Sequence, residues 1–166
     1  MFRTSLLLLA SALASFTLSS CSSTSTAAGT FLGDRDVSAQ GGLIVTDSSQ
    51  AYSDTISALD AAIRGKGLRL FSRVSHSEGA RGVGLDLGPT ELFIFGNPNV
   101  GTLLMQASRT VGLDLPQRML VWQDESGVHI AHNDPAWLGV RHGFEHPALA
   151  KISGLLAGLA STAAGN

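Results

Sequence analysis

The spacing of hydrophobic positions predicts a strand and a helix at the start of the main folded region. Residues 42–46 (GLIVT) form a short apolar run between turn-forming residues, which is typical of a strand. Asp47, Ser48 and Ser49 then offer side chains that could cap a helix. Apolar positions recur three or four residues apart, as on one helical face, at Tyr52, Ile56, Leu59 and Ile63.

The rest of the pattern predicts further strands separated by short helices. Apolar runs predict strands at residues 68–74, 91–95, 118–123 and 128–133, and helices at 100–107 and 135–140. Residues 124–127 (DESG) suit a hairpin turn, whereas 79–88 are too rich in glycine to assign. One face of a last helix carries Leu149, Ile152, Leu156 and Leu159. This order predicts an α+β fold, an antiparallel sheet of about four to five strands with helices on one face.

The extreme N-terminus follows a different pattern, which is typical of a signal peptide. Arg3 precedes an apolar run at residues 6–13 (LLLLASAL) that is too short to span a bilayer, since a spanning helix needs about 20 residues. Small and hydroxylic residues follow this run and end in Leu18-Ser19-Ser20-Cys21, which resembles the lipobox of bacterial lipoproteins. That resemblance implies that the chain is cut before Cys21 and that its thiol carries lipid. An ordinary secreted protein cut near the same point is the alternative.

The predicted organisation has three parts. Residues 1–20 form the lipoprotein signal peptide, residues 21–40 form the lipidated cysteine with a flexible tether rich in Ser, Thr, Ala and Gly, and residues 41–162 form a single domain. Ser22 stands after the cysteine where an aspartate would stand in the other sorting class. In a Gram-negative host this implies a bacterial cell envelope protein, lipid-anchored in the outer membrane and facing the periplasm.

The composition excludes several kinds of function for the domain. Cys21 is the single cysteine of the chain, so with lipid on it there is no disulfide, no thiol nucleophile and no cysteine-based metal site. The formal net charge is −2, and no basic run indicates nucleic acid as a partner. The predicted partner is therefore the membrane, reached through the lipid.

Several short motifs support a resemblance to a known family. They are FGNP at 95–98, GTLLMQ at 101–106, GLDLP at 112–116, VWQD at 121–124 and NDP at 133–135. In this order they resemble the domain-of-unknown-function family number 302 over about residues 42–145. The resemblance implies a TBP-like fold with a β-α-β-β-β-β-α core, often found as a homodimer, and no established reaction. The Ala/Leu/Gly-rich segment after Pro147 departs from the family pattern.

Polar residues near the predicted strand ends are candidates for a ligand pocket. They are His76, Asn97, Gln106, His132, Asp134 and His142. The favoured interpretation is structural: Asn97, which precedes a proline at a strand end, holds a tight turn. The functional alternative is a pocket between the helix at 100–107 and the sheet, lined by Asn97, Gln106, His132 and Asp134, with His132 and Asp134 on one face of a strand.

The histidines also support an alternative function, a copper-like metal-binding protein or an enzyme that uses His132, Asp134 and His142. Met105 and Met119 would supply soft ligands for such an ion. Residues 142–146 (HGFEH) match an H-x-x-E-H zinc-enzyme string, but Gly143 predicts a helix end between its two histidines. We therefore assign no metal, cofactor or catalytic residue, and expect a non-enzymatic binding or assembly module.

Overall fold

A computed structural model describes residues 41–166; the predicted signal peptide, Cys21 and the tether lie outside these residues. The described part contains one five-stranded antiparallel sheet with strand order β1-β5-β4-β3-β2. Its strands are β1 (Leu43–Ser48), β2 (Arg69–Ser75), β3 (Thr90–Gly96), β4 (Gln117–Asp124) and β5 (Gly127–Asn133). The predicted strands are therefore present, with bounds shifted by one or two residues.

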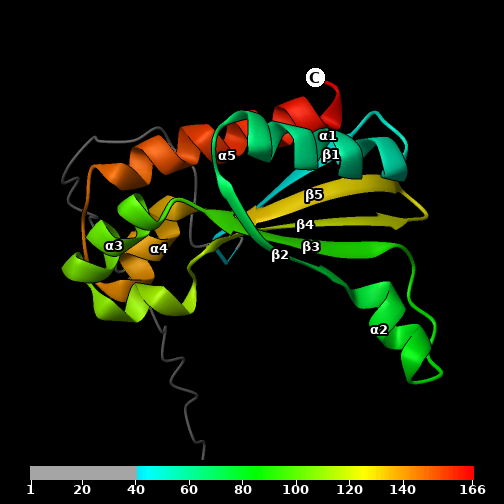
Figure 1. The fold of residues 1–166 in the computed structure, drawn as a ribbon, viewed down its shortest axis with the longest axis horizontal. Coiled ribbons are helices and arrows are strands. Elements are labelled where there is room, and N and C mark those ends of the chain that lie inside the picture. Colours follow the sequence, from blue (N-terminus) through cyan, green and yellow to red (C-terminus); the bar gives the residue numbers. More distant parts are fainter. Residues whose placement is uncertain (1–40) are drawn as a thin grey trace, which may run out of the picture. The chain divides into compact units, whose positions relative to one another are not determined.

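Two long helices cover one face of this sheet. They are α1 (Tyr52–Gly65) and α5 (Ala148–Ala164), which lie side by side above the strands in Figure 1. The shorter helices are α2 (His76–Gly82), α3 (Pro98–Ala107), the 3-10 helix η1 (Arg109–Leu113) and α4 (Pro135–His142). Helices α3 and α4 gather at one end of the sheet and α2 projects beyond the other (Figure 1). No helix among residues 41–166 has the length and apolar character needed to cross a membrane.

This architecture is the predicted α+β fold. The core order β-α-β-β-β-β-α corresponds to β1, α1, β2, β3, β4, β5 and α5, with the short helices inserted between strands. The glycine-rich segment 79–88 that gave no assignment begins inside α2, which starts where Ser75 accepts a hydrogen bond from the Glu78 amide. No residue of α2 is buried.

The core lies between the covered face of the sheet and the two long helices. Leu59 and Ile63 of α1 and Leu156 and Leu159 of α5 are all completely buried. They belong to one cluster with inward-facing strand residues such as Phe93. Burying each such side chain stabilises the fold by about 1.5–3 kcal/mol. The spacing of hydrophobic positions thus identified the correct face of both helices.

The expected cap of α1 is wrong. Asp47 and Ser48 belong to β1, because the strand continues to pair with β5 as far as Ser48 opposite Val128. The residue before α1 is Ala51, whose side chain makes no capping bond. Ser49 is used elsewhere: its hydroxyl and amide both donate to the Ala164 carbonyl at the end of α5.

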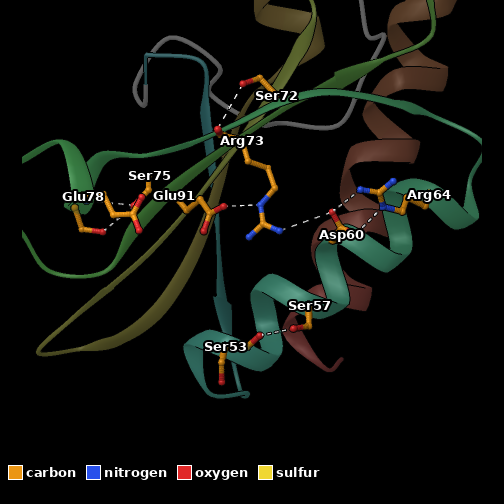
Figure 2. A network of polar contacts seen from close by, with 10 residues as sticks. Ser53, Ser57, Asp60, Arg64, Ser72, Arg73, Ser75, Glu78 and Glu91 are labelled. Carbon is orange, nitrogen blue, oxygen red and sulfur yellow. Dashed lines mark hydrogen bonds and ion pairs between the residues drawn. The ribbon is translucent and has the colours of Figure 1, made fainter.

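Ion pairs at the surface connect α1 to the β2 edge of the sheet (Figure 2). Arg73 of β2 donates to Glu91 of β3 and also lies 3.9 Å from Asp60 of α1. Asp60 in turn accepts a hydrogen bond from Arg64 at 2.7 Å, and this bond lowers the pKa of the Asp60 carboxyl. Because these groups keep contact with water at the surface, we expect their ion pairs to add little to stability.

A close contact fixes the start of β1 against α4. The Gly42 carbonyl accepts a hydrogen bond of 2.7 Å from the Asp134 amide. Gly42 has a φ of +71°, and a Cβ at this position would lie 2.1 Å from Cγ of Trp137. The guanidinium of Arg141 lies 5.1 Å from the centroid of the same indole. We call this contact between Gly42 and Trp137 the Gly42 junction.

Candidate functional site

The face of the sheet opposite α1 and α5 carries an apolar row that crosses all five strands. The register places Val45, Ala131, Leu120, Leu92 and Val74 opposite one another, on β1, β5, β4, β3 and β2 in turn. We call these five residues the open-face row. None of them belongs to the core cluster between the sheet and the long helices or packs against it, although Ala131, in the row, is only 4% exposed. Val45 and Val74, at the two ends, are 48% and 37% exposed.

An acidic cluster flanks one side of the open-face row. His129 of β5 bonds through Nδ1 to Asp47 Oδ1 at 2.7 Å and through Nε2 to Asp124 Oδ1 at 3.2 Å. Its ring stacks on Trp122, with the centroids 4.9 Å apart. The hydrogen bond to Asp47 is the main reason that the pKa of His129 is raised, and Asp124 adds to the effect. On the other side of the row, β4 carries Arg118.

The same cluster has the connectivity of a serine-histidine-aspartate triad, because Ser126 Oγ lies 2.9 Å from His129 Nε2. Its chemistry is different. The Ser126 hydroxyl also lies 2.5 Å from Asp124 Oδ1, to which it donates. The raised pKa of His129 favours a protonated imidazole, which cannot accept the proton of a serine. The cluster therefore joins the β4–β5 hairpin to β1 rather than activating a nucleophile.

A second polar cluster joins η1 to α4. His142 donates from Nε2 to Asp114 Oδ2 at 2.6 Å, and its Nδ1 accepts from the Thr110 hydroxyl at 3.0 Å. Arg141 donates to the other oxygen of Asp114 at 3.1 Å. Asp114 is buried, so these two donors compensate its charge. Both ring nitrogens of His142 are thus occupied by neighbouring side chains.

Two buried side chains in the described part of the chain each have a polar nitrogen without a hydrogen-bond partner. His132 and Gln117 each expose less than a tenth of their surface. His132 donates from Nδ1 to the Asn133 carbonyl at 2.8 Å. Within residues 41–166, His132 Nε2 and Gln117 Nε2 have no hydrogen-bond partner. Burial lowers the pKa of His132, which favours the neutral imidazole.

The six residues predicted to form a pocket lie on different elements, and several of them make local bonds. Asn97 caps α3 by accepting from the Asn99 amide, as the structural interpretation predicts, and Asp134 caps α4 in the same way. Asp134 does not share a strand face with His132, because β5 ends at Asn133. Gln106 is exposed on α3, and His76 begins α2 at the far end of the sheet (Figure 1). No three His, Cys, Asp or Glu residues in the described part of the chain are placed to hold a metal ion.

A family comparison agrees with this fold. The family described as "Domain of unknown function DUF302" matches residues 44–159. The chain belongs to this family. The match extends beyond residue 145 into α5, so the Ala/Leu/Gly-rich segment includes family structure rather than only an addition to it.

Relatives of this DUF302 protein include longer chains and one solved structure. It is 51% identical over 102 residues to "Fluoride-specific ion channel FluC 1" of Brucella suis, covering 61% of this chain and 40% of that protein. "FluC 1" of Brucella abortus has the same identity, with 38% of its length covered. The chain thus spans about two fifths of these curated relatives. An uncharacterized DUF302 protein from Bacillus stearothermophilus has the same fold, with a TM-score of 0.65, 24% identity and coverage of 74% of this chain and 98% of that one.

The clusters of this DUF302 domain gave little signal in the sequence. Asp114 and Thr110 lie about 30 residues before His142, and η1, which carries Thr110, is a short 3-10 turn without clear periodicity. The open-face row could have been predicted from the sequence, because alternate strand positions point to opposite faces of a sheet. Apolar residues on both faces of β3 and β4 are the signal for a second contact surface.

Proposed function

We propose that this DUF302 domain is a non-enzymatic assembly module, held at the envelope by lipid on Cys21, that pairs with a second copy of itself through the open-face row. The observation that carries the proposal is the apolar row itself. A row of five apolar residues across a sheet face that no long helix of the described chain covers is typical of an interaction surface.

The size of the face supports a second copy as the occupant. Five strands spaced about 4.8 Å apart, each with six residues rising about 3.3 Å, give a face of roughly 24 by 20 Å. Two such faces in contact would bury about 1,000 Å² in total, the lower limit for a specific protein interface. A dimer of moderate stability is therefore the expected assembly.

The charges beside the row also favour self-association. The acidic cluster with Asp47 and Asp124 lies on one side of the row, and Arg118 lies on the other. A two-fold axis along the row would place the acidic side of one copy against the Arg118 side of the other. Such an arrangement gives both apolar contact and opposite charges at the rim.

The lipid on Cys21 would hold this assembly at the membrane surface. Two anchors in one dimer would hold it at the membrane more firmly than one, because the second lipid acts at high effective concentration. For this chain we place the anchor in the bacterial cell envelope and, in a Gram-negative host, in the outer membrane facing the periplasm.

The pairing is tested with the chain from residue 21 onward carrying Cys21→Ser, which removes the lipid. We expect a dimer mass by light scattering at tens of micromolar and a monomer mass for Val45→Lys, which places a charge at the end of the row. Val140→Lys is the control, because Val140 is 78% exposed on α4 and lies outside the row. A wild-type monomer, or equal effects of the two substitutions, contradicts the proposal.

The anchor is tested separately in whole cells. The native chain should fractionate with membranes and yield an acylated N-terminal Cys21 by mass spectrometry, while Cys21→Ser should leave the membrane fraction. A chain that remains soluble without the substitution would contradict the anchor and leave the pairing to be judged by its own test.

A further inference from the structure

His132 and Gln117 lie on neighbouring strands, on the covered face of the sheet. His132 of β5 is directly opposite Met119 of β4, and Gln117 is two residues before Met119 on the same face. Diagonal neighbours of this kind have Cα atoms about 7–8 Å apart. His132 and Gln117 are 3% and 8% exposed, and their cross-strand partners Met119 and Phe95 are 0% and 1% exposed.

The hydrogen-bonding roles of the two groups are complementary. Because Nδ1 of His132 donates to the Asn133 carbonyl, Nε2 of the neutral ring carries a lone pair and can only accept. Gln117 Nε2 can only donate. Neither atom has a partner in the described part of the chain. Buried polar groups in folded proteins are almost always bonded, so such a pair points to a bound group.

The group that fits both atoms is one that donates and accepts through a single atom, which is a hydroxyl. We propose that His132 and Gln117 form an internal site for one hydroxyl oxygen, supplied by a water molecule or by a small alcohol. The oxygen donates its hydrogen to His132 Nε2 and accepts from Gln117 Nε2. A metal cation fits less well, because the Gln117 Nε2 group is a hydrogen-bond donor and the cross-strand partners Phe95 and Met119 carry no charge.

The site is separate from the proposed pairing surface. His132, Gln117 and Met119 face the core, whereas the open-face row lies on the opposite side of the same strands. The inference therefore does not depend on dimer formation. The proposed site lies on the covered face, near the end of β5 that leads into α4.

Nuclear magnetic resonance of the ¹⁵N-labelled chain with Cys21→Ser tests the site. We expect the Gln117 side-chain amide protons to show cross-relaxation with a long-lived water molecule and the His132 Nε2 resonance to have the shift of a hydrogen-bonded, unprotonated nitrogen. Gln106 is the matched control, because its amide is exposed on α3 and should contact only rapidly exchanging water. His132→Phe should abolish the long-lived signal at Gln117.

Titration with ethanol distinguishes the two sources of the hydroxyl. A saturable displacement of the Gln117 and His132 signals identifies a site open to small alcohols, and an unchanged water signal identifies a resident water. Both outcomes support the proposal. It is overturned if wild-type Gln117 shows neither a long-lived water signal nor an alcohol effect, or if one equivalent of copper or zinc displaces the His132 resonances.

Discussion

Substitution of Gly42 by alanine should destabilise the domain far more than the same substitution at Gly41. Both glycines have positive φ, +60° at Gly41 and +71° at Gly42. An alanine in this conformation costs about 1–2 kcal/mol at either position. Only at Gly42 does the added methyl group meet other atoms, because its Cβ would lie 2.1 Å from Cγ of Trp137, while nothing lies within 4 Å at Gly41.

The extra cost at Gly42 comes from overpacking of a rigid indole. Forcing a methyl group into a well-packed contact costs about 1–3 kcal/mol. We therefore expect a total loss of about 2–5 kcal/mol for Gly42→Ala and about 1–2 kcal/mol for Gly41→Ala. With a urea dependence of about 2 kcal/mol per molar, the unfolding midpoints of the two variants should differ by about 0.5–1.5 M.

Urea unfolding followed by far-ultraviolet circular dichroism measures this difference. Adding Trp137→Leu to Gly42→Ala should recover part of the lost free energy, because the smaller side chain makes room for the methyl group, and a double-mutant cycle gives the coupling. Equal midpoints for the Gly41 and Gly42 variants, or no coupling to Trp137, would refute the reasoning.

Three further predictions concern other parts of the domain. The pKa of His129 is raised, so its ion pairs should stabilise the fold at pH below about 6.5, and this contribution should fade as pH rises through the folded-state pKa. An NMR titration should show a lower His129 pKa in Asp47→Asn than in the native domain, and an equal pKa would contradict the assigned role of Asp47. Leu59→Ala should cost about 2–5 kcal/mol in urea unfolding, whereas Leu103→Ala, at a side chain that is 50% exposed, should cost much less. Asp114→Asn should cost roughly 1–3 kcal/mol, because it removes the charge that two neighbouring donors require; a neutral effect in thermal unfolding would show that the cluster is dispensable.

Local patterns in the sequence predicted the elements whose signals are local. The face of α5 follows from its apolar spacing, and the hairpin follows from its turn residues, although β4 and β5 pair up to Asp124 opposite Gly127 and leave only two residues in the turn. The helix end at Gly143, which adopts a φ of +65°, separates the two histidines of the HGFEH string as expected. In each of these cases the signal lies within the element itself and does not depend on a distant partner.

Patterns that depend on distant partners could not be predicted. Ser49 looks like a helix cap in the sequence, but its position beside the end of α5 is set by the packing of α1 and α5. The bonds of His142 depend on Asp114, which the chain path around η1 brings to α4. Spacing alone likewise grouped His132 with Asp134, which in the fold begins a different element.

The Gly42 junction also determines how the domain would bear mechanical load. A pull on the chain from the N-terminal side reaches the described fold at Gly42 and then β1, an edge strand whose neighbour is β5. A force along β1 acts on all of the hydrogen bonds between β1 and β5 at once, whereas a force across the strand breaks these bonds one at a time. The Gly42–Asp134 hydrogen bond and the indole of Trp137 are the first contacts to carry that force. Single-molecule pulling from the N-terminus should therefore detect a weaker first barrier in Gly42→Ala than in the native chain.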